Sequence, residues 1–108
     1  MTQELWEILV PTKHPNGNVI PVDYHRVWDA KVREISHGMT IAPPAKGEWV
    51  NPEGTLFAEE MIPVRFLGTK EQALEIAKFT LNYYDQEAVM HYKISNEVSL
   101  IYKEEHGL

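Results

Sequence analysis

The amino-acid sequence predicts an α+β fold: an antiparallel sheet of four to five strands with two helices on one face and an extra β-hairpin. Two observations lead to this prediction. Segments of strand and helix periodicity follow one another as strand, helix, strand, hairpin strand, helix, strand, and a strong turn signal separates the middle strands. This order is that of a ferredoxin-like sandwich. With 108 residues the chain can bury one core, so we expect a single domain over residues 1–108.

The first strand and the first helix are expected in the amino-terminal third. Residues 5–10 form an apolar run that ends before a proline, as a strand does when it leads into a loop. In that loop, Asn16-Gly17 predicts a tight turn. Asp23 stands where a helix N-cap is expected, and Gly38 where a left-handed residue ends a helix. Between them, apolar residues at helical spacing predict the helix: Tyr24, Val27, Trp28, Val32 and Ile35.

The middle of the chain predicts a hairpin. A brief strand is expected at residues 39–42, and strand character resumes at residues 48–50. Residues 51–54 carry a proline at the second position and a glycine at the fourth, which predicts a turn with a left-handed glycine. Residues 55–67 then form a long strand, whose alternation directs three side chains to the core: Ile62, Val64 and Phe66.

The second helix begins at a capping box formed by Thr69 and Gln72. Its apolar stripe continues through Ala73, Ile76, Ala77, Thr80, Leu81 and Tyr84. Residues 88–94 are expected to form the last strand. Beyond them Val98, Leu100 and Tyr102 alternate, which fits either a hairpin or an extension of that strand.

The helices cover only one face of this sheet, so the other face must be explained. Apolar side chains are expected there at Phe57, Met61, Leu67 and Val89. We therefore expect a homo-oligomer, most simply a two-fold dimer, with the hairpin around Trp49 reaching towards its neighbour. The alternative is that loops of the same chain cover these residues.

Composition narrows the possible partners. Ten basic against sixteen acidic residues give a net charge of −6, which disfavours a nucleic-acid partner. No apolar run is long enough to span a membrane, and residues 1–4 lack the character of a secretory signal, so we expect a cytoplasmic protein with no membrane partner. The chain has no cysteine and no glycine-rich phosphate loop, and we expect no cofactor.

Candidate ligand-binding residues lie where elements meet. Tyr84 ends the second helix, and Gln86 and Glu87 follow it, where polar side chains either bond loose backbone groups or point into a cavity. Glu60 has the parity of the core-facing residues, and a carboxylate on an apolar face must be paired, be protonated or lie near the rim of the core, where water reaches it. We expect it near the rim. If it is instead buried beside a helix end or His25, it becomes a candidate acid or base.

Three further candidates come from the hairpin and the first helix. Trp49 is flanked by proline and glycine, and an aromatic residue so placed anchors either a subunit contact or a ligand wall. His25 and Arg26 lie at a helix start, which attracts anions, although both could equally be solvated. No metal site is expected, because the one histidine spaced four residues from a candidate carboxylate, His91 after Glu87, follows a helix-to-strand break. No catalytic residue can be named.

A pattern G-x-T, G-x-W, G, E, Y-x-Q-E-x-V covers the central half of the chain. Its positions are Gly38, Thr40, Gly47, Trp49, Gly54, Glu59 or Glu60, Tyr84, Gln86, Glu87 and Val89. The pattern resembles that of a family of small, functionally uncharacterised bacterial proteins. Members usually carry a leader segment and a phenylalanine before the glutamine, where this chain has Asp85. The resemblance implies a ferredoxin-like fold and carries over no catalytic role.

Two classes of function follow from these observations. In the first, a pocket for a small molecule is lined by the uncovered face of the sheet together with Trp49, Glu60, Tyr84 and Gln86, and the protein binds this molecule or transforms it by acid-base chemistry without a cofactor. In the second, a subunit or another protein fills the same face, and the chain is a structural or regulatory interaction module. The two classes differ in whether Glu60 and Gln86 share a cavity. We favour the first.

Overall fold

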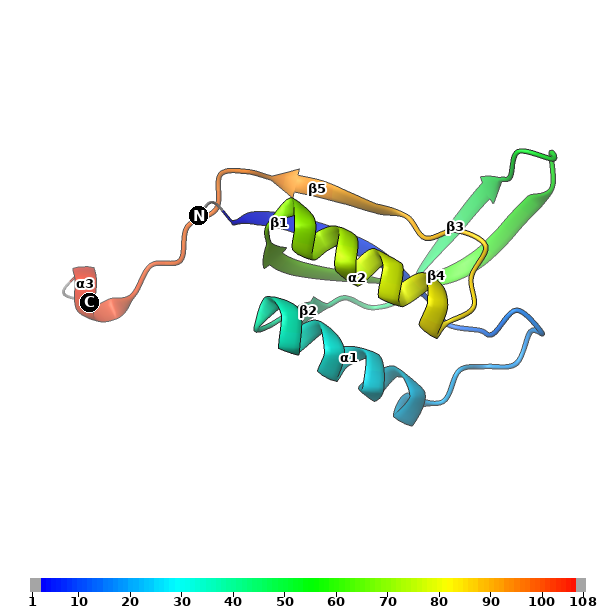
Figure 1. Ribbon diagram of the computed structural model, residues 1–108, viewed down its shortest axis with the longest axis horizontal. Helices are drawn as coiled ribbons and strands as arrows, with labels where there is room; N and C mark the ends of the chain where they lie inside the picture. The colour runs from blue at the N-terminus through cyan, green and yellow to red at the C-terminus, as the bar shows by residue number, and fades with distance from the viewer. Residues whose placement is uncertain (1–2, 107–108) are drawn as a thin grey trace.

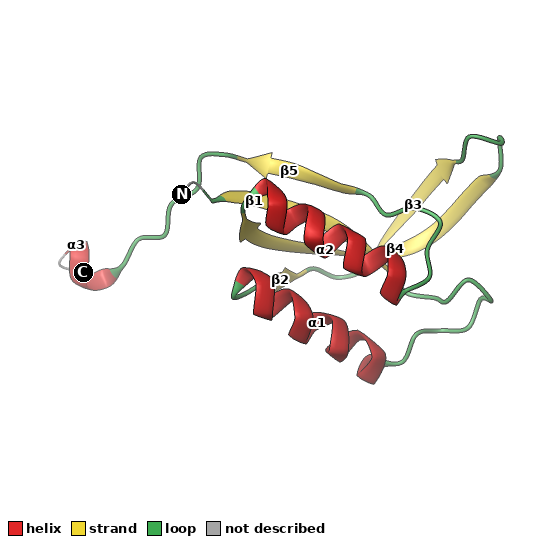
Figure 2. Ribbon diagram, in the orientation of Figure 1, coloured by secondary structure: helices red, strands yellow, loops and turns green. Residues whose placement is uncertain are grey.

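The computed structural model describes residues 3–106, which form a five-stranded antiparallel sheet and three helices (Figure 1). Figure 2 shows both long helices on the same side of the sheet. The predicted α+β sandwich with an extra hairpin is confirmed. The elements in chain order are β1 (Glu4–Pro11), α1 (Val22–Ser36), β2 (Thr40–Ile41), β3 (Ala45–Val50), β4 (Leu56–Gly68), α2 (Lys70–Tyr83), β5 (His91–Ser95) and α3 (Lys103–His106).

The sheet is built around β1 and β4. The strand order is β2-β4-β1-β5, with β3 paired to β4 beyond β2. β4 changes partner along its outer edge: Phe57 lies opposite Trp49 of β3, whereas Val64 lies opposite Ile41 of β2. β3 and the first part of β4 therefore form a two-stranded hairpin that projects beyond the rest of the sheet, here named the arm (residues 45–61; Figure 1).

The hydrophobic core lies between the two long helices and the sheet. Its largest fully buried side chains are Trp28, Tyr84 and Phe66. Trp28 donates its indole N–H to the Thr80 hydroxyl at 2.9 Å, so the one polar atom of this side chain is satisfied inside the core. Other members come from β1, β4 and α2, among them Ile8, Val10, Val64, Ala73 and Ile76. Ile62 is half-buried and packs against this cluster, as its parity predicts.

The boundaries of α1 differ from those predicted. The helix starts at Val22 with Pro21 as its N-cap, and no side chain caps it, so the prediction that Asp23 is the cap is wrong. Pro21 has φ −65° and ψ 152°, a conformation that its ring favours. Asp23 lies in the first turn, where its negative charge interacts favourably with the positive end of the helix dipole. The left-handed C-terminal residue is His37, at φ 67°, and not Gly38. Its amide closes the last turn by donating to the Arg33 carbonyl at 2.8 Å.

Two predicted local motifs are confirmed. Thr69 and Gln72 form the capping box of α2, with each side chain accepting a hydrogen bond from the backbone amide of the other residue. At the tip of the arm, Gly54 has φ 85°, and its amide donates to the Asn51 carbonyl at 3.0 Å. The Asn51 side-chain oxygen also accepts the amides of Glu53 and Thr55, which closes the turn.

The face of the sheet away from the helices, named the open face, combines apolar residues with one buried carboxylate. Glu7 accepts a hydrogen bond from Arg65 Nε at 2.9 Å and a second from the Tyr92 hydroxyl. Half-buried apolar residues surround it: Leu5, Leu9, Met61, Pro63 and Leu67. The prediction that Val89 lies on the open face is wrong. β5 starts only at His91, and Val89 belongs to the preceding loop and packs against the core.

The carboxyl-terminal segment after β5 neither folds back as a hairpin nor extends the strand. β5 ends at Ser95, whose hydroxyl bonds the Glu97 backbone in a turn. Residues 96–106, named the tail, then run away from the sheet and end in α3 (Figure 1). Large apolar side chains stay exposed along the tail: Val98 (38%), Leu100 (63%), Ile101 (67%) and Tyr102 (55%). The alternation of Val98, Leu100 and Tyr102 therefore corresponds neither to a hairpin strand nor to an extension of β5.

Candidate functional site

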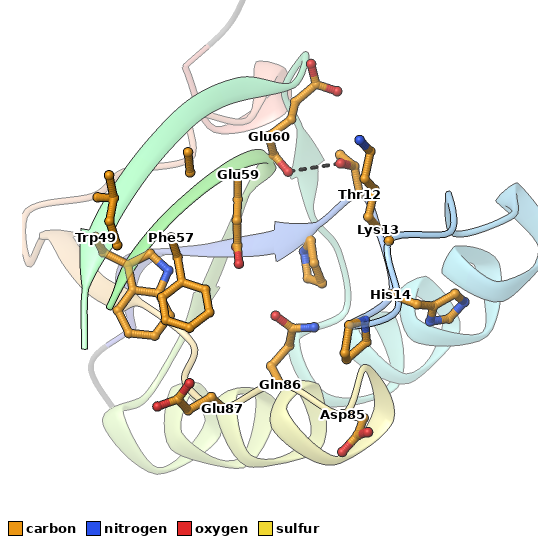
Figure 3. Close-up of a pocket in the computed structure, with 15 residues that line it drawn as sticks. Thr12, Lys13, His14, Trp49, Phe57, Glu59, Glu60, Asp85, Gln86 and Glu87 are labelled. Carbon is orange, nitrogen blue, oxygen red and sulfur yellow. Dashed lines mark hydrogen bonds between the residues drawn. The ribbon is translucent and has the colours of Figure 1, made fainter. Parts of the chain in front are cut away.

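A cavity of about 610 Å³ lies against the arm and is named the arm cavity (Figure 3). Three segments that are distant in the sequence form its walls. One wall is the arm itself, the second is the loop after β1 at residues 11–17, and the third is the loop after α2 at residues 85–87. The cavity therefore exists only because β4 brings the arm over the ends of β1 and α2.

An aromatic pair forms one wall of the cavity. The rings of Trp49 and Phe57 are stacked, with centroids 4.6 Å apart and planes 14° apart. The stacking follows from strand register, because the two residues lie directly opposite each other in the β3–β4 ladder. Both side chains are half-buried, so part of the pair remains accessible from the cavity.

Two consecutive glutamates on β4 have different orientations. Figure 3 shows the Glu59 carboxylate directed into the cavity and the Glu60 carboxylate directed away from it. The Glu60 backbone carbonyl accepts a hydrogen bond from Thr12 Oγ1 at 3.0 Å, which ties the arm to the loop after β1. Glu60 does have the parity of Ile62 and Val64, but the arm projects past the helices, so that face is uncovered and Glu60 is exposed.

The loop after α2 supplies the opposite wall. Asp85 adopts φ 52°, which lets the chain leave the helix sharply. The Gln86 amide side chain donates to the Tyr84 carbonyl at 3.1 Å, and Figure 3 shows the same side chain at the edge of the cavity space. Glu87 accepts a hydrogen bond from the Asn51 side-chain amide at 3.3 Å, a second link between this loop and the arm. Gln86 thus both bonds the helix end and lines the cavity.

The seven candidate residues fall into two groups. Trp49, Glu60, Gln86 and Glu87 line the arm cavity. The other three lie elsewhere: Tyr84 is buried in the core, and its hydroxyl is 2.6 Å from His25 Nδ1. His25 and Arg26 border a second, smaller cavity of about 160 Å³ between α1 and the sheet edge. Glu60 is therefore not beside His25.

Sequence reasoning did not single out Glu59 or Phe57 as site residues. The signal was present: both have the parity of Met61, and strand pairing places Phe57 opposite Trp49 and Glu59 opposite Gly47. Gly47 leaves room beside Glu59 because it carries no side chain. Together with the hairpin register, the alternation along residues 55–67 therefore indicates that Glu59, and not Glu60, is on the same face as Trp49 and Phe57.

The lining of the arm cavity carries an excess of negative charge. Its carboxylates are Glu59, Glu60, Asp85 and Glu87, and its one ammonium group belongs to Lys13. Four ion pairs occur among the residues described, and none includes any of these five side chains. Over the same residues, no group of three or more histidine, aspartate or glutamate side chains is arranged to hold a metal ion.

The group around His25 lies outside the arm cavity but responds to pH. Burial lowers the pKa of His25, and the Asp29 carboxylate opposes this shift. Burial also raises the pKa of the Tyr84 hydroxyl, which therefore stays protonated and donates to the neutral imidazole Nδ1. A protonated imidazole has no nitrogen that can accept a hydrogen bond. Protonation of His25 therefore removes the hydrogen bond that Nδ1 accepts from the Tyr84 hydroxyl.

Acidification is expected to destabilise the fold through His25. Its pKa is lower in the folded state than the value of about 6.5 in the unfolded chain, so the unfolded state binds more protons below that pH. The free energy of unfolding should therefore fall as the pH decreases below about 6.5. Urea denaturation from pH 7.5 to 5.5 measures this, and His25→Gln should flatten the dependence. The control is the exposed His37, replaced by asparagine, which tolerates its left-handed backbone. An unchanged slope in His25→Gln would contradict the assignment.

No family model and no curated protein sequence matches this chain. Solved structures with a similar fold include a divalent cation tolerance protein, Cut A1, from Thermus thermophilus, with a TM-score of 0.63 and 10% identity over 97% of this chain and 92% of that one. CutA1 from Oryza sativa has a TM-score of 0.66 and 7% identity over 93% and 84% of the two chains. A phage SAM lyase in complex with S-methyl-5′-thioadenosine has a TM-score of 0.68 and 12% identity over 88% and 82%.

These comparisons show a shared fold. The fold that the resembled family implies is confirmed by the similarity to the cation tolerance proteins, whereas the residue pattern itself stays a prediction. At this level of identity no ligand or activity transfers from one chain to another. The site must be interpreted from its own residues.

Proposed function

We propose that this protein binds a small molecule in the arm cavity. The observation that supports this most is the meeting of an aromatic pair, Trp49 and Phe57, with the polar groups of Glu59 and Gln86 around one open volume of about 610 Å³. Small-molecule sites typically occupy about 300–1,000 Å³ and combine apolar walls with a few convergent polar groups. Glu60 and Gln86, whose sharing of a cavity distinguishes the two classes of function, both line this cavity, which supports the proposal, although the Glu60 carboxylate points away from it.

The fold is compatible with such a role. The phage lyase with a similar fold is described in complex with a nucleoside thioether, so a domain of this architecture can hold a small molecule. Within the arm cavity, Glu59 is the side chain positioned to exchange a proton with a bound molecule, which would allow acid-base chemistry without a cofactor. Glu60 has no such position, because its carboxylate points away.

The second candidate function, an interaction module, is favoured by the tail and the open face. Tail side chains such as Leu100 and Ile101 are more than half exposed, and the open face presents a second set of apolar residues. Monomeric proteins seldom leave contiguous apolar surface uncovered. We therefore propose that the chain forms a homo-oligomer, most simply a two-fold dimer, and that small-molecule binding takes place in the assembled protein.

Native mass spectrometry of freshly purified protein tests both functions at once. Assemblies carrying extra mass would support ligand binding, and Trp49→Ala should lose that mass while keeping the same subunit number. Assemblies without extra mass would favour the interaction module. Loss of assembly in Trp49→Ala would instead place this residue in a subunit interface, and a monomer in all samples would contradict the homo-oligomer.

The cellular location stays a prediction. Within residues 3–106, no helix is long and apolar enough to cross a bilayer. The CutA protein of Archaeoglobus fulgidus, which has a similar fold at 13% identity, is described as periplasmic. We propose a cytoplasmic location for this chain, and fractionation of cells expressing the protein from its own gene distinguishes the two compartments.

A further inference from the structure

The chemistry of the arm cavity narrows the class of molecule that it can hold. Trp49 and Phe57 form an aromatic wall on the arm, and Figure 3 shows the Glu59 carboxylate projecting from the same arm into the space, with Glu87 on the facing loop after α2. A bound molecule that fills the space must therefore contact an aromatic surface and a carboxylate at the same time.

The charge balance favours a cation. Four acidic residues and one lysine line the cavity, and their side chains take no part in the ion pairs formed among residues 3–106. Of the carboxylates, Figure 3 shows that of Glu59 directed into the space and that of Glu60 directed away from it. An anion in the space would be repelled by the Glu59 carboxylate. A neutral molecule would leave the negative charge uncompensated, although partly solvated.

The aromatic wall favours an organic cation over a metal ion. A tryptophan face attracts a cation through its ring quadrupole, and it also buries hydrocarbon attached to that cation. Divalent metal ions need several oxygen or nitrogen ligands within a short distance, and the described histidine and carboxylate side chains form no such group. The combination suits a positive charge carried on an apolar or planar body.

We propose that the arm cavity binds a monovalent organic cation, with its apolar or planar part against Trp49 and Phe57 and its charge near Glu59. This proposal rests on the proposed small-molecule function and specifies the ligand class of the same site. Trp49 provides the contact surface, Glu59 the opposite charge, and the hydrogen bond between Asn51 and Glu87 holds the arm against the loop after α2.

A pair of probes that differ in charge tests the proposal. N-methylquinolinium is a planar cation, and quinoline is a neutral molecule of similar shape at pH 8. Titration monitored by NMR of the Trp49 indole N–H should give an affinity about tenfold higher for the cation. The difference should shrink with added sodium chloride, because the charged walls are accessible to solvent. Magnesium chloride serves as the inorganic cation.

Single substitutions separate the contribution of the Glu59 charge to binding from that of the aromatic wall. Glu59→Gln keeps the shape of the side chain and should reduce the affinity for N-methylquinolinium about tenfold without changing that for quinoline. The matched control is Glu48→Gln, since Glu48 lies on the same arm but does not line the cavity. Phe57→Leu keeps an apolar wall and should weaken binding of the cation by removing a ring.

The possible outcomes separate two questions: whether the ligand is an organic cation, and whether the arm cavity binds small molecules at all. Preferential binding of N-methylquinolinium that depends on Glu59 supports the proposal. Equal binding of quinoline and its cation overturns the cation preference but keeps the small-molecule function. Magnesium competing for Glu59 without any aromatic response overturns the organic class. Absence of binding by all three probes overturns the proposal and counts against the small-molecule function as well.

Discussion

Replacing Trp28 by alanine is expected to lower the free energy of unfolding by about 3–5 kcal/mol, the typical cost of deleting a buried tryptophan. Trp28 is 1% exposed and packs where α1, α2 and the sheet meet. The substitution opens a large hole in the core and removes the hydrogen bond to Thr80. Thr80 keeps a partner, because its hydroxyl also donates to the Ile76 carbonyl, so the main loss is packing.

Urea denaturation at one fixed protein concentration measures this effect, because assembly would make the stability depend on concentration. Two controls separate packing from aromaticity and from hydrogen bonding. Trp28→Phe keeps most of the volume and should cost less than Trp28→Ala. Trp49→Ala changes a half-buried residue on the arm and should cost about 1 kcal/mol or less. Equal losses in Trp28→Ala and Trp49→Ala would contradict the prediction, because they would show that the arm contributes as much to the stability as the helix-sheet interface.

The second large effect is expected in the assembly of the chain. Removing everything after Ser95 should convert the assembled protein into a monomer that is still folded. Residues 96–104 of the tail are all exposed, so removal of the tail leaves the core intact. In the proposed homo-oligomer, by contrast, Leu100 and Ile101 lose their solvent exposure, and each such side chain contributes about 1.5–3 kcal/mol when fully buried.

Sedimentation velocity across a concentration series measures the assembly, and circular dichroism checks the fold. A point variant avoids truncation: Ile101→Asp introduces a charge at a position that is 67% exposed in the single chain. The control is Ser99→Asp, which adds the same charge to a neighbouring polar residue of the tail. If the truncated chain retains the mass of the intact assembly, the tail is not part of the interface and the open face or the arm must provide it.

The fold could be predicted because its signals are local. The capping box at Thr69 and Gln72, the turn that ends at Gly54 and the alternation through Val64 and Phe66 each depend on a few neighbouring residues. The errors are also local in origin. Pro21 and His37 replaced Asp23 and Gly38 at the ends of α1, because several residues near a helix end can adopt the required backbone conformation.

The site was less predictable because it depends on long-range placement. The choice between Glu59 and Glu60 required the register of β3 against β4 and the projection of the arm beyond the helices, and neither is encoded in one short segment. The separation of Tyr84 and His25 from the arm cavity has a similar cause. Tyr84 is two residues from Gln86, but its side chain is buried in the core, where its hydroxyl meets His25.

The central position of β1 has a consequence for the synthesis of the protein. β1 leaves the ribosome before the other strands of the sheet, yet the residues that pair with its two edges come much later: Arg65 of β4 and Tyr92 of β5 both lie opposite Glu7. Contacts between residues so distant in sequence form slowly. Until they form, the apolar residues 5–10 remain available to chaperones or to other nascent chains. β1, which lies inside the finished sheet, is therefore synthesised long before the two strands that pair with it.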